Sequence, residues 1–272
     1  MVTQAIIPLA GLGTRLLPLS SVIPKELLPI NGKPNLEYIM EECIEAGIKQ
    51  FIFVVPKNRP SIKKYFFNNN FYKKILKKKK NDKRLKNVFK RLKKLQKMIK
   101  FVYQNKPEGT GHAVLQCKKY LKGTHFLMLL ADDLIVKKNC SKEMISLHRR
   151  TKGSVIATRK VERRTVSRWG ILGFKNKTKN SFLINEVIEK PKLSEAPSNY
   201  AIIGRYILPR KILSVLKMQG RGKGGEIHIT DAIKTLVKKD EKFYGNIFKG
   251  KYIDCGTLDG FIKSGLTISK YL

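Results

Sequence analysis

The sequence lacks several features that mark membrane-bound, redox-active and zinc-ribbon proteins. No run approaches the ~18 consecutive apolar residues of a membrane-spanning helix. Residues 1–10 contain no basic segment that would start a secretion signal. The four cysteines are widely separated and form no C-x-x-C pair, which predicts reduced, mostly buried thiols. We therefore expect a cytoplasmic protein without a membrane partner.

Acidic residues are also scarce: 20 Asp and Glu stand against 57 Lys and Arg, and the formal net charge is +37. Such an excess is compatible with binding to nucleic acid or to an anionic surface. However, the chain has 44 Lys and 13 Arg, and Arg is the residue suited to bidentate recognition of phosphates and bases. A composition that follows AT-rich codons explains this Lys excess better, so we expect no specific nucleic-acid partner.

The order of sequence patterns predicts an α/β fold. Apolar runs at residues 4–10, 51–55, 100–104 and 125–130 are typical of buried strands, and segments with helical spacing separate them. Strands joined through helices pair in parallel. We expect a mostly parallel twisted sheet flanked by helices, followed after Gly153 by a smaller portion of shorter strands. Asn35 and Thr230 are predicted helix N-caps, and Gly47 is a predicted helix stop.

Residues 68–100 differ from the rest in composition. Lysines are dense here, but apolar residues recur beneath them at helical spacing, at Leu85, Val88, Phe89, Leu92, Leu95 and Ile99. This pattern predicts an amphipathic helix with a solvated basic face, in preference to a basic arm for nucleic acid.

A glycine-rich loop after the first strand carries the first chemical signal. In Gly11-Leu12-Gly13-Thr14-Arg15, the glycines would let backbone N–H groups approach phosphate oxygens, and Arg15 could neutralise a triphosphate. The third glycine of a dinucleotide fingerprint is replaced by Leu16, and no Gly-Lys-Ser/Thr of a P-loop follows. The loop therefore predicts phosphate binding of another class.

Together with Pro24-Lys25-Glu26-Leu27-Leu28-Pro29, this loop resembles the signature of sugar nucleotidyltransferases. The whole chain resembles the bacterial-type UTP–glucose-1-phosphate uridylyltransferases of that family. Further blocks match in family order, namely Gln104…Gly109-x-Gly111-His112-Ala113, Asp132-Asp133, Trp169-Gly170, Glu189-Lys190-Pro191, Gly204-Arg205-Tyr206, Gly225-Glu226-Ile227…Thr230-Asp231-Ala232 and Asp254-Cys255-Gly256. Several of these blocks are weak alone, but their order along nearly the whole chain is specific.

The resemblance implies a fold, an activity and a cofactor. The fold is a single Rossmann-like nucleotidyltransferase domain over residues 1–272, with a nucleotide-binding portion at 1–150 and a sugar-phosphate-binding and assembly portion at 151–272. The activity is uridylyl transfer from UTP to glucose 1-phosphate with the help of Mg²⁺, in a homo-oligomer that is a dimer or a tetramer. Positioning and charge neutralisation suffice for such chemistry, so no nucleophilic side chain is needed.

The resemblance also implies roles for individual residues. The residues expected to bind the nucleotide are Leu9, Gly11, Gly13, Thr14, Gln104, Gly109 and Asp133. The expected catalytic cations are Arg15, Lys25 and Lys190. The residues expected at the sugar are Gly170, Glu189 and Gly204, and the expected Mg²⁺ ligands are Asp132 and Asp254.

Glu189 and Lys190 are neighbours, and neighbouring strand residues normally point to opposite faces. Pro191 has no N–H for a strand ladder and restricts the residue before it. We therefore expect the strand to end or bend there, so that both side chains reach one substrate.

Two alternatives remain open. The first is the same chemistry with another substrate such as dTTP, although related thymidylyltransferases carry Ser-Lys-Gln and Asp-Thr-Gly where this chain has Pro24-Lys25-Glu26 and Asp254-Cys255-Gly256. The second is a non-catalytic paralogue retained for regulation or for binding polyanions. Ser20-Ser21 stands where the family usually has Thr-Lys, so one expected cation for phosphate is missing. The intact charged residues of the other blocks argue against this second alternative.

Overall fold

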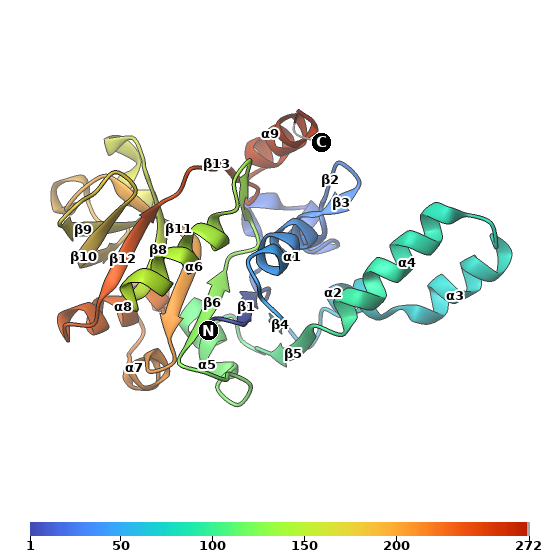
Figure 1. The fold of residues 1–272 in the computed structure, drawn as a ribbon, viewed down its shortest axis with the longest axis horizontal. Helices are drawn as coiled ribbons and strands as arrows, with labels where there is room; N and C mark the ends of the chain where they lie inside the picture. The colour runs from blue at the N-terminus through green and yellow to red at the C-terminus, as the bar shows by residue number, and fades with distance from the viewer. Residues whose placement is uncertain (271–272) are drawn as a thin grey trace.

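A nine-stranded sheet forms the centre of the molecule in this computed structural model, which describes residues 1–270 (Figure 1). The strand order is β5-β4-β1-β6-β11-β8-β12-β10-β9. In that order the bounds are Ile99–Tyr103, Gln50–Val55, Gln4–Pro8, His125–Leu129, Tyr200–Pro209, Ser154–Lys160, Phe243–Ile247, Ser181–Glu189 and Gly170–Lys175. Because β6 pairs with β11, the sheet runs without a break through the two predicted portions.

The predicted α/β fold is confirmed, but the sheet is mixed rather than mostly parallel. β5, β4, β1 and β6 are parallel neighbours, as is the pair β8 and β12. The pairs β6–β11, β11–β8, β12–β10 and β10–β9 are antiparallel. The reason lies in the connections: helices join the early strands, whereas a short turn joins β9 to β10, and short turns produce antiparallel pairs.

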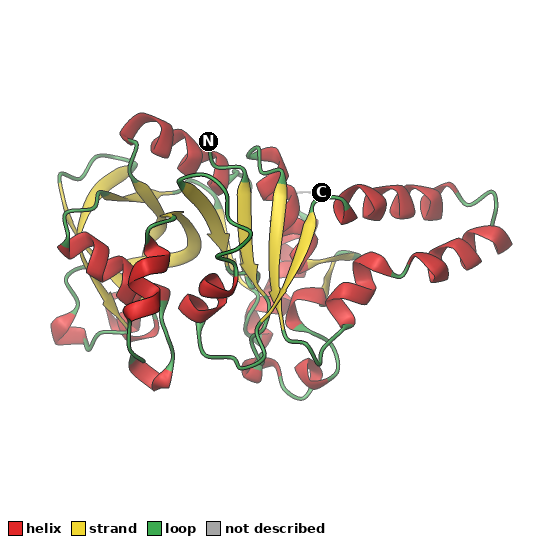
Figure 2. Ribbon diagram, turned by 90° about the horizontal axis from the view of Figure 1, so that it is seen from below, coloured by secondary structure: helices red, strands yellow, loops and turns green. Residues whose placement is uncertain are grey.

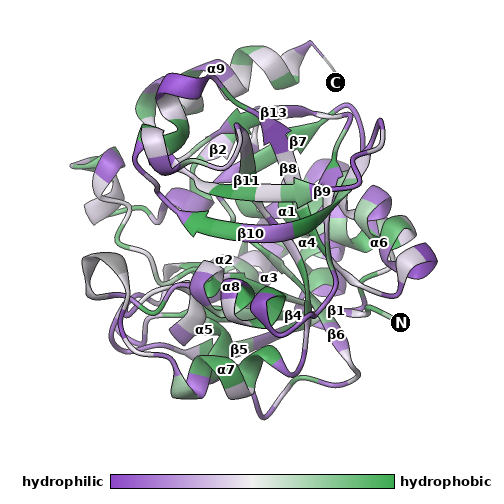
Figure 3. Ribbon diagram, turned by 90° about the vertical axis from the view of Figure 1, so that its left-hand side faces the viewer, coloured by the Kyte–Doolittle hydropathy of each residue, from purple (hydrophilic) through white to green (hydrophobic). Residues whose placement is uncertain are grey.

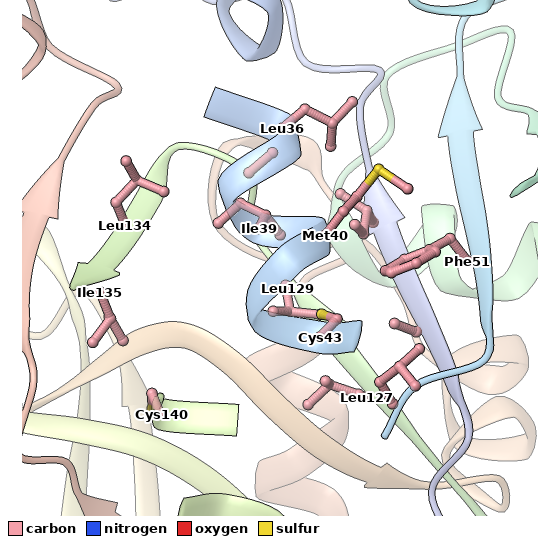
Figure 4. Close-up of a cluster of buried hydrophobic side chains, with 14 of the residues drawn as sticks. Leu36, Ile39, Met40, Cys43, Phe51, Leu127, Leu129, Leu134, Ile135 and Cys140 are labelled. Atoms are coloured by element: carbon pink, nitrogen blue, oxygen red, sulfur yellow. The ribbon is translucent and has the colours of Figure 1, made fainter. Parts of the chain in front are cut away.

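Alternate residues of the strands face two separate cores, because successive strand side chains point to opposite faces. Ile6, Ile52 and Met128 lie in the core on one face, covered by α5 (Thr110–Gln116), α7 (Ile212–Met218) and α8 (Ile229–Lys238). The next residues along these strands lie in the other core, with α1 (Asn35–Glu45) and α6 (Cys140–Thr151). Figure 4 shows how Leu36, Ile39, Met40 and Cys43 of α1 face this second core. In Figure 3 the covering helices are two-toned, with hydrophobic and hydrophilic residues on different faces.

Two two-stranded sheets and the helix α9 (Leu258–Ser269) lie beside the main sheet. β7 (Asp133–Val136) pairs with β13 (Lys251–Asp254) beside the main sheet, and β2 (Pro29–Ile30) pairs with β3 (Lys33–Pro34). α9 follows β13.

The basic segment forms a helical arm rather than one helix. After α2 (Ser61–Phe67), α3 (Asn69–Lys78) and α4 (Lys83–Gln96) make a hairpin that projects from the body (Figures 1 and 2). The two helices are separate because Asp82 caps the start of α4: its side chain accepts a hydrogen bond from the N–H of Leu85 at 2.9 Å. The predicted basic face is confirmed, since the lysines of α4 are exposed. The apolar stripe is confirmed at Leu92 and Leu95, which are buried, but Ile99 begins β5 and is not part of the helix.

Two of the predicted caps are wrong. Asn35 is the first residue of α1, after Pro34, and its side chain bonds to a distant loop instead of to its own helix. Thr230 lies inside α8, after His228. Gly47 follows α1 with φ +94°, as a helix stop requires. All four cysteines are free and buried, as predicted. Within residues 1–270, no helix combines the length and hydrophobicity needed to cross a bilayer.

Candidate active site

The carboxyl ends of the parallel strands open onto two adjoining cavities. The loop after β1, the end of β5 and the loop after β6 meet at this edge, where α/β sheets place their ligands. The first cavity has a volume of about 500 Å³ and the second of about 840 Å³. Both are lined by Thr14, Arg15, Leu130, Asp132 and Glu226.

The first cavity collects most of the predicted nucleotide-binding residues. It is lined by Gly11, Gly13, Thr14, Arg15, Lys25, Gln104, Gly109 and Asp132. Nε2 of Gln104 donates to the carbonyl of Gly109 at 3.2 Å and lies 2.9 Å from Nδ1 of His112. Gly109 has φ +99°, and a Cβ there would lie 2.6 Å from the carbonyl oxygen of Ile227. Only glycine fits this turn.

The second cavity collects the predicted sugar-binding residues. Its lining includes Asp133, Gly170, Glu189, Lys190, Gly204 and Asp254. One predicted residue is not brought to either cavity: the side chain of Leu9 is 2% exposed and packs in the core. Any contact between Leu9 and a nucleotide would have to come from its backbone.

Opposite charges face each other where the two cavities meet. Nζ of Lys25 lies 2.6 Å from Oδ2 of Asp132, and Arg15 lies 3.6 Å from Asp132 and 3.9 Å from Asp254. Burial disfavours the charge on Lys25, but the carboxylates of Asp132 and Glu26 together outweigh it and raise the lysine's pKa. Burial likewise works against the charge on Asp132, yet Lys25 holds that carboxyl's pKa below its ordinary value. Both groups are therefore charged at neutral pH.

The carboxylates of Asp132 and Asp254 face the same space. A Cβ built on Gly256 would lie 2.7 Å from Oδ2 of Asp132 and 3.1 Å from Oδ1 of Asp254. Two hard oxygen donors of this kind fit Mg²⁺, which binds one or two carboxylates and fills its remaining positions with water and substrate phosphate. Within residues 1–270, no group of three or more His, Cys, Asp or Glu side chains is arranged to hold a metal. A metal here would thus depend on these two aspartates and on substrate oxygens.

Both carboxylate oxygens of Asp133 accept hydrogen bonds from other parts of the protein. Its Oδ1 accepts a hydrogen bond from the hydroxyl of Tyr252 at 2.5 Å, and its Oδ2 accepts one from the N–H of Gly204 at 3.0 Å. Burial, together with the neighbouring charge of Asp132, raises the pKa of Asp133 to about 6. Its contact with a nucleotide stays a prediction.

The expected bend at Glu189 and Lys190 is present. β10 ends at Glu189, and Lys190 takes the left-handed conformation, with φ +47°. The N–H of Lys190 donates to the carbonyl of Trp169 at 2.9 Å, which fixes the bend. Nζ of Lys190 lies 3.9 Å from Oε1 of Glu189. Both side chains therefore line the second cavity.

The cavities also contain residues without a predicted role. Glu26 lines the first cavity with its side chain almost fully buried, and burial raises its pKa to about 7. Tyr252, Thr230 and Arg168 line the second. Tyr252 stands two residues before Asp254 on β13, and this period-two spacing was the one available signal for it. Trp169 packs edge-on against Tyr252, with ring centroids 6.0 Å apart, and lines the same cavity.

Comparison with known families decides the class. A model of the nucleotidyl transferase family matches residues 4–270. The chain belongs to this nucleotidyl transferase family. The resemblance inferred from its motifs is therefore confirmed.

Individual relatives of this nucleotidyl transferase agree. The UTP–glucose-1-phosphate uridylyltransferase 2 of Staphylococcus saprophyticus is 39% identical over 266 residues, which are 97% of this chain and 90% of that protein. The enzyme of the same name from Streptococcus pyogenes serotype M3 is 37% identical over 271 residues, 97% of this chain and 89% of that one. A solved UDP-glucose pyrophosphorylase in complex with UDP-glucose superposes with a TM-score of 0.86, 34% identity and complete coverage of both chains. The solved structure of a UTP-bound UGPase from Acinetobacter baumannii superposes with a TM-score of 0.83 and 32% sequence identity. The match covers 98% of this chain and 93% of that one.

Proposed function

We propose that this nucleotidyl transferase joins UTP and glucose 1-phosphate to give UDP-glucose and pyrophosphate. The observation that carries the proposal is the junction of the two cavities, where Arg15, Lys25, Asp132 and Asp254 meet. A reaction between two anions needs cations and a metal at the point of contact. Relatives named for this reaction match almost the whole chain.

The bond changes are those of an in-line displacement. A phosphate oxygen of the sugar phosphate forms a bond to the α-phosphorus of UTP, while the bond from that phosphorus to the bridging oxygen of the β-phosphate breaks. The electron pair leaves with pyrophosphate. In this scheme the glycine loop and Arg15 bind the triphosphate, Lys25 neutralises charge at the reacting centre, and Lys190 binds the sugar phosphate.

The remaining contacts set the selectivity of the two cavities. Gln104 and the turn at Gly109 would read the edge of the uracil, and Gly170, Glu189 and the backbone at Gly204 would hold the sugar. Asp132 and Asp254 would hold Mg²⁺, which lowers the negative charge that the two reactants present to each other. Precise placement of both substrates then supplies most of the rate enhancement.

One assay tests this assignment. The purified protein with Mg²⁺ is given UTP, ATP, CTP, GTP or dTTP, each paired in turn with the 1-phosphate of glucose, galactose or N-acetylglucosamine. We expect pyrophosphate release to be fastest with UTP and glucose 1-phosphate. A clear preference for dTTP would replace the nucleotide assignment, and the lack of turnover with every pair would favour a regulatory paralogue.

We also propose that the protein is cytoplasmic and forms a homo-oligomer, a dimer or a tetramer, because the family resemblance implies it. Light scattering coupled to size-exclusion chromatography tests the second point. A mass of 31.2 kDa, that of one chain, would contradict it.

A further inference from the structure

Four consecutive backbone carbonyls around Asp132 each accept a hydrogen bond from another part of the fold. Nη1 and Nη2 of Arg205 donate to the carbonyls of residues 130 and 133, at 3.2 and 2.5 Å. Nδ2 of Asn35 donates to the carbonyl of residue 131 at 2.6 Å. The N–H of Cys255 donates to the carbonyl of Asp132 at 2.7 Å. One guanidinium thus holds the loop on both sides of Asp132.

Arg205 is itself held by a buried carboxylate. Its side chain is 0% exposed and that of Glu42, on α1, is 8% exposed. Nε and Nη2 of Arg205 donate to Oε2 of Glu42 at 3.2 and 2.9 Å. Oε1 of Glu42 also accepts from the N–H and the hydroxyl of Ser141, at the start of α6, at 3.1 and 2.6 Å. The pair therefore joins α1, α6 and β11 to the loop that carries Asp132.

The same network reaches the strand that carries Asp254. The carboxylate of Asp133 bridges the N–H of Gly204, next to Arg205, and the hydroxyl of Tyr252 on β13. Asp254 lies two residues further along β13. Both predicted metal ligands are thus attached to one set of buried hydrogen bonds.

A buried ion pair usually adds little to the stability of a protein, because well-packed apolar residues in its place often give an equally or more stable protein. The pair at Arg205 instead fixes the orientation of the groups that it binds. A guanidinium presents several donors in a rigid plane, so it can hold two carbonyls and one carboxylate in fixed relative positions. Mg²⁺ requires near-ideal octahedral geometry, so small displacements of its ligands lower the affinity of the site for the metal.

We propose that the Glu42–Arg205 pair, with Asn35, positions Asp132 and Asp254 for metal binding. This inference rests on the proposed function, in which those aspartates hold Mg²⁺. Arg205 touches no substrate, because it is wholly buried, and acts only through the loop at residues 130–133.

The test measures metal binding apart from catalysis. Mn²⁺ is titrated into the protein with UTP and without sugar phosphate, and free Mn²⁺ is followed by electron paramagnetic resonance. Arg205→Lys keeps the charge opposite Glu42 but loses the planar fork. We expect a folded variant whose Mn²⁺ affinity is lower by about tenfold or more, as for other partners of metal ligands. Arg210→Lys, the same change at an exposed position nearby on the chain, should leave the affinity unchanged.

The outcomes separate three possibilities. A folded Arg205→Lys with wild-type Mn²⁺ affinity overturns the inference alone, provided that Asp132→Asn loses the metal. Wild-type affinity in Asp132→Asn overturns the metal assignment of the proposed function, and the inference with it. If Arg205→Lys does not fold, Asn35→Ala decides, since it removes one neutral donor to the carbonyl of Ala131. Weakened Mn²⁺ binding in that variant supports the inference, and unchanged binding overturns it.

Discussion

The ammonium of Lys25 and the carboxylate of Asp132 form a mostly buried ion pair with a separation of 2.6 Å. The two residues are 107 positions apart, and their contact joins the Lys25–Leu27 turn, which helps to line the first cavity, to the loop after β6. Each residue favours the charged form of the other. The pair brings a cation for phosphate and a donor for a metal to the same point.

Asp132→Asn and Asp254→Asn should each reduce kcat by about 10²-fold or more, the usual size for removing a charge that stabilises a transition state. The fold should persist, because Asn keeps the shape of Asp. Asp259→Asn, an exposed change on the nearby helix α9, is the matched control and should keep wild-type rates. Rates are measured at limiting and at saturating Mg²⁺. Near-normal rates for both variants at limiting Mg²⁺ would remove these aspartates from the metal site.

The two glycines of the first loop should respond differently to alanine. A Cβ on Gly11 would meet no atom within 4 Å, whereas Gly13 has φ +68° and a Cβ there would lie 3.1 Å from that of Ser20. Gly11→Ala should therefore keep its Tm but raise KM for UTP, because the methyl group enters the first cavity. Gly13→Ala should also lose about 1–2 kcal/mol of stability from its left-handed backbone. An unchanged KM for UTP in Gly11→Ala would mean that the loop does not approach phosphate closely.

The sequence predicted the early strands and the site loops because they obey local rules. A buried strand followed by Gly11-Leu12-Gly13 or by Asp132-Asp133 places those residues at the same sheet edge, once the strands are known to be parallel. The antiparallel half escaped prediction, because β11 pairs with β6 and β8 over separations that no local pattern reveals. Family blocks supplied the residues of the second cavity.

Other errors came from tertiary contacts that override local preference. Asn35 has the side chain of a good N-cap, but it bonds to a carbonyl 96 residues away. Glu42 and Arg205 are in contact across 163 positions, and their sequence neighbourhoods contain no sign of it. The interruption between α3 and α4 could have been predicted from the local sequence. Asn81-Asp82 lies between basic residues, and these residue types favour the end of one helix and the N-cap of the next.

Stability should depend on pH through Glu26. Burial raises its pKa from 4.5 to about 7, although the charge of Lys25 opposes the shift. The native state then binds this proton more tightly than the unfolded chain does. The stabilising contribution is therefore complete below about pH 4.5 and is lost as pH rises through about 7.

Glu26→Gln removes this titration, so the free energy of unfolding of the variant relative to wild type should rise between pH 5 and pH 8. The gain should be about 1–3 kcal/mol, since each pKa unit corresponds to about 1.4 kcal/mol. Urea unfolding at the two pH values measures it. Glu162→Gln, which affects an exposed ion pair with Arg164, should show no such change. A pH-independent difference for Glu26→Gln would contradict the shifted pKa.

The charges of the helical arm formed by α2, α3 and α4 should not be needed for the catalytic step. Within residues 61–98, 16 Lys and Arg accompany a single acid, Asp82, which caps α4. Changing the exposed Lys77, Lys83, Lys86 and Lys90 to Gln should spare kcat. Any loss in kcat/KM should vanish with added salt, because exposed charges are screened within ~8 Å at physiological ionic strength. A loss of kcat that salt does not alter would place the arm in the active site.

Arg91 differs from the exposed lysines of the same arm because it pairs with a buried carboxylate. Its Nε lies 3.1 Å from Oε2 of Glu37, whose side chain is 1% exposed. Arg91→Gln should lower stability by about 1–3 kcal/mol, because it leaves a buried carboxylate without its cation. The four-lysine variant should show no comparable loss of Tm. Equal effects would mean that Arg91 behaves as another solvated charge.

The sugar phosphate offers the sharpest test of paired roles, since Glu189 and Lys190 are adjacent yet line one cavity. Lys190→Ala should weaken the use of every sugar 1-phosphate about equally. Loss of one charge-assisted hydrogen bond, about 2–3 kcal/mol, corresponds to roughly 30- to 150-fold in kcat/KM. Lys190→Gly should lose as much activity but keep more stability, because glycine tolerates the backbone at φ +47° without strain.

Glu189→Gln should instead change the ranking of the sugars. A carboxylate that accepts hydrogen bonds from hydroxyls discriminates by leaving partners unpaired when a hydroxyl is misplaced. The measurement is kcat/KM with UTP for glucose 1-phosphate and galactose 1-phosphate, for wild type and for each variant. The ratio between the two sugars should hold in both Lys190 variants and fall in Glu189→Gln. If Lys190→Ala shifts the ratio while Glu189→Gln preserves it, the two roles are assigned the wrong way round, and the bend at Lys190 would then serve the sugar rather than its phosphate.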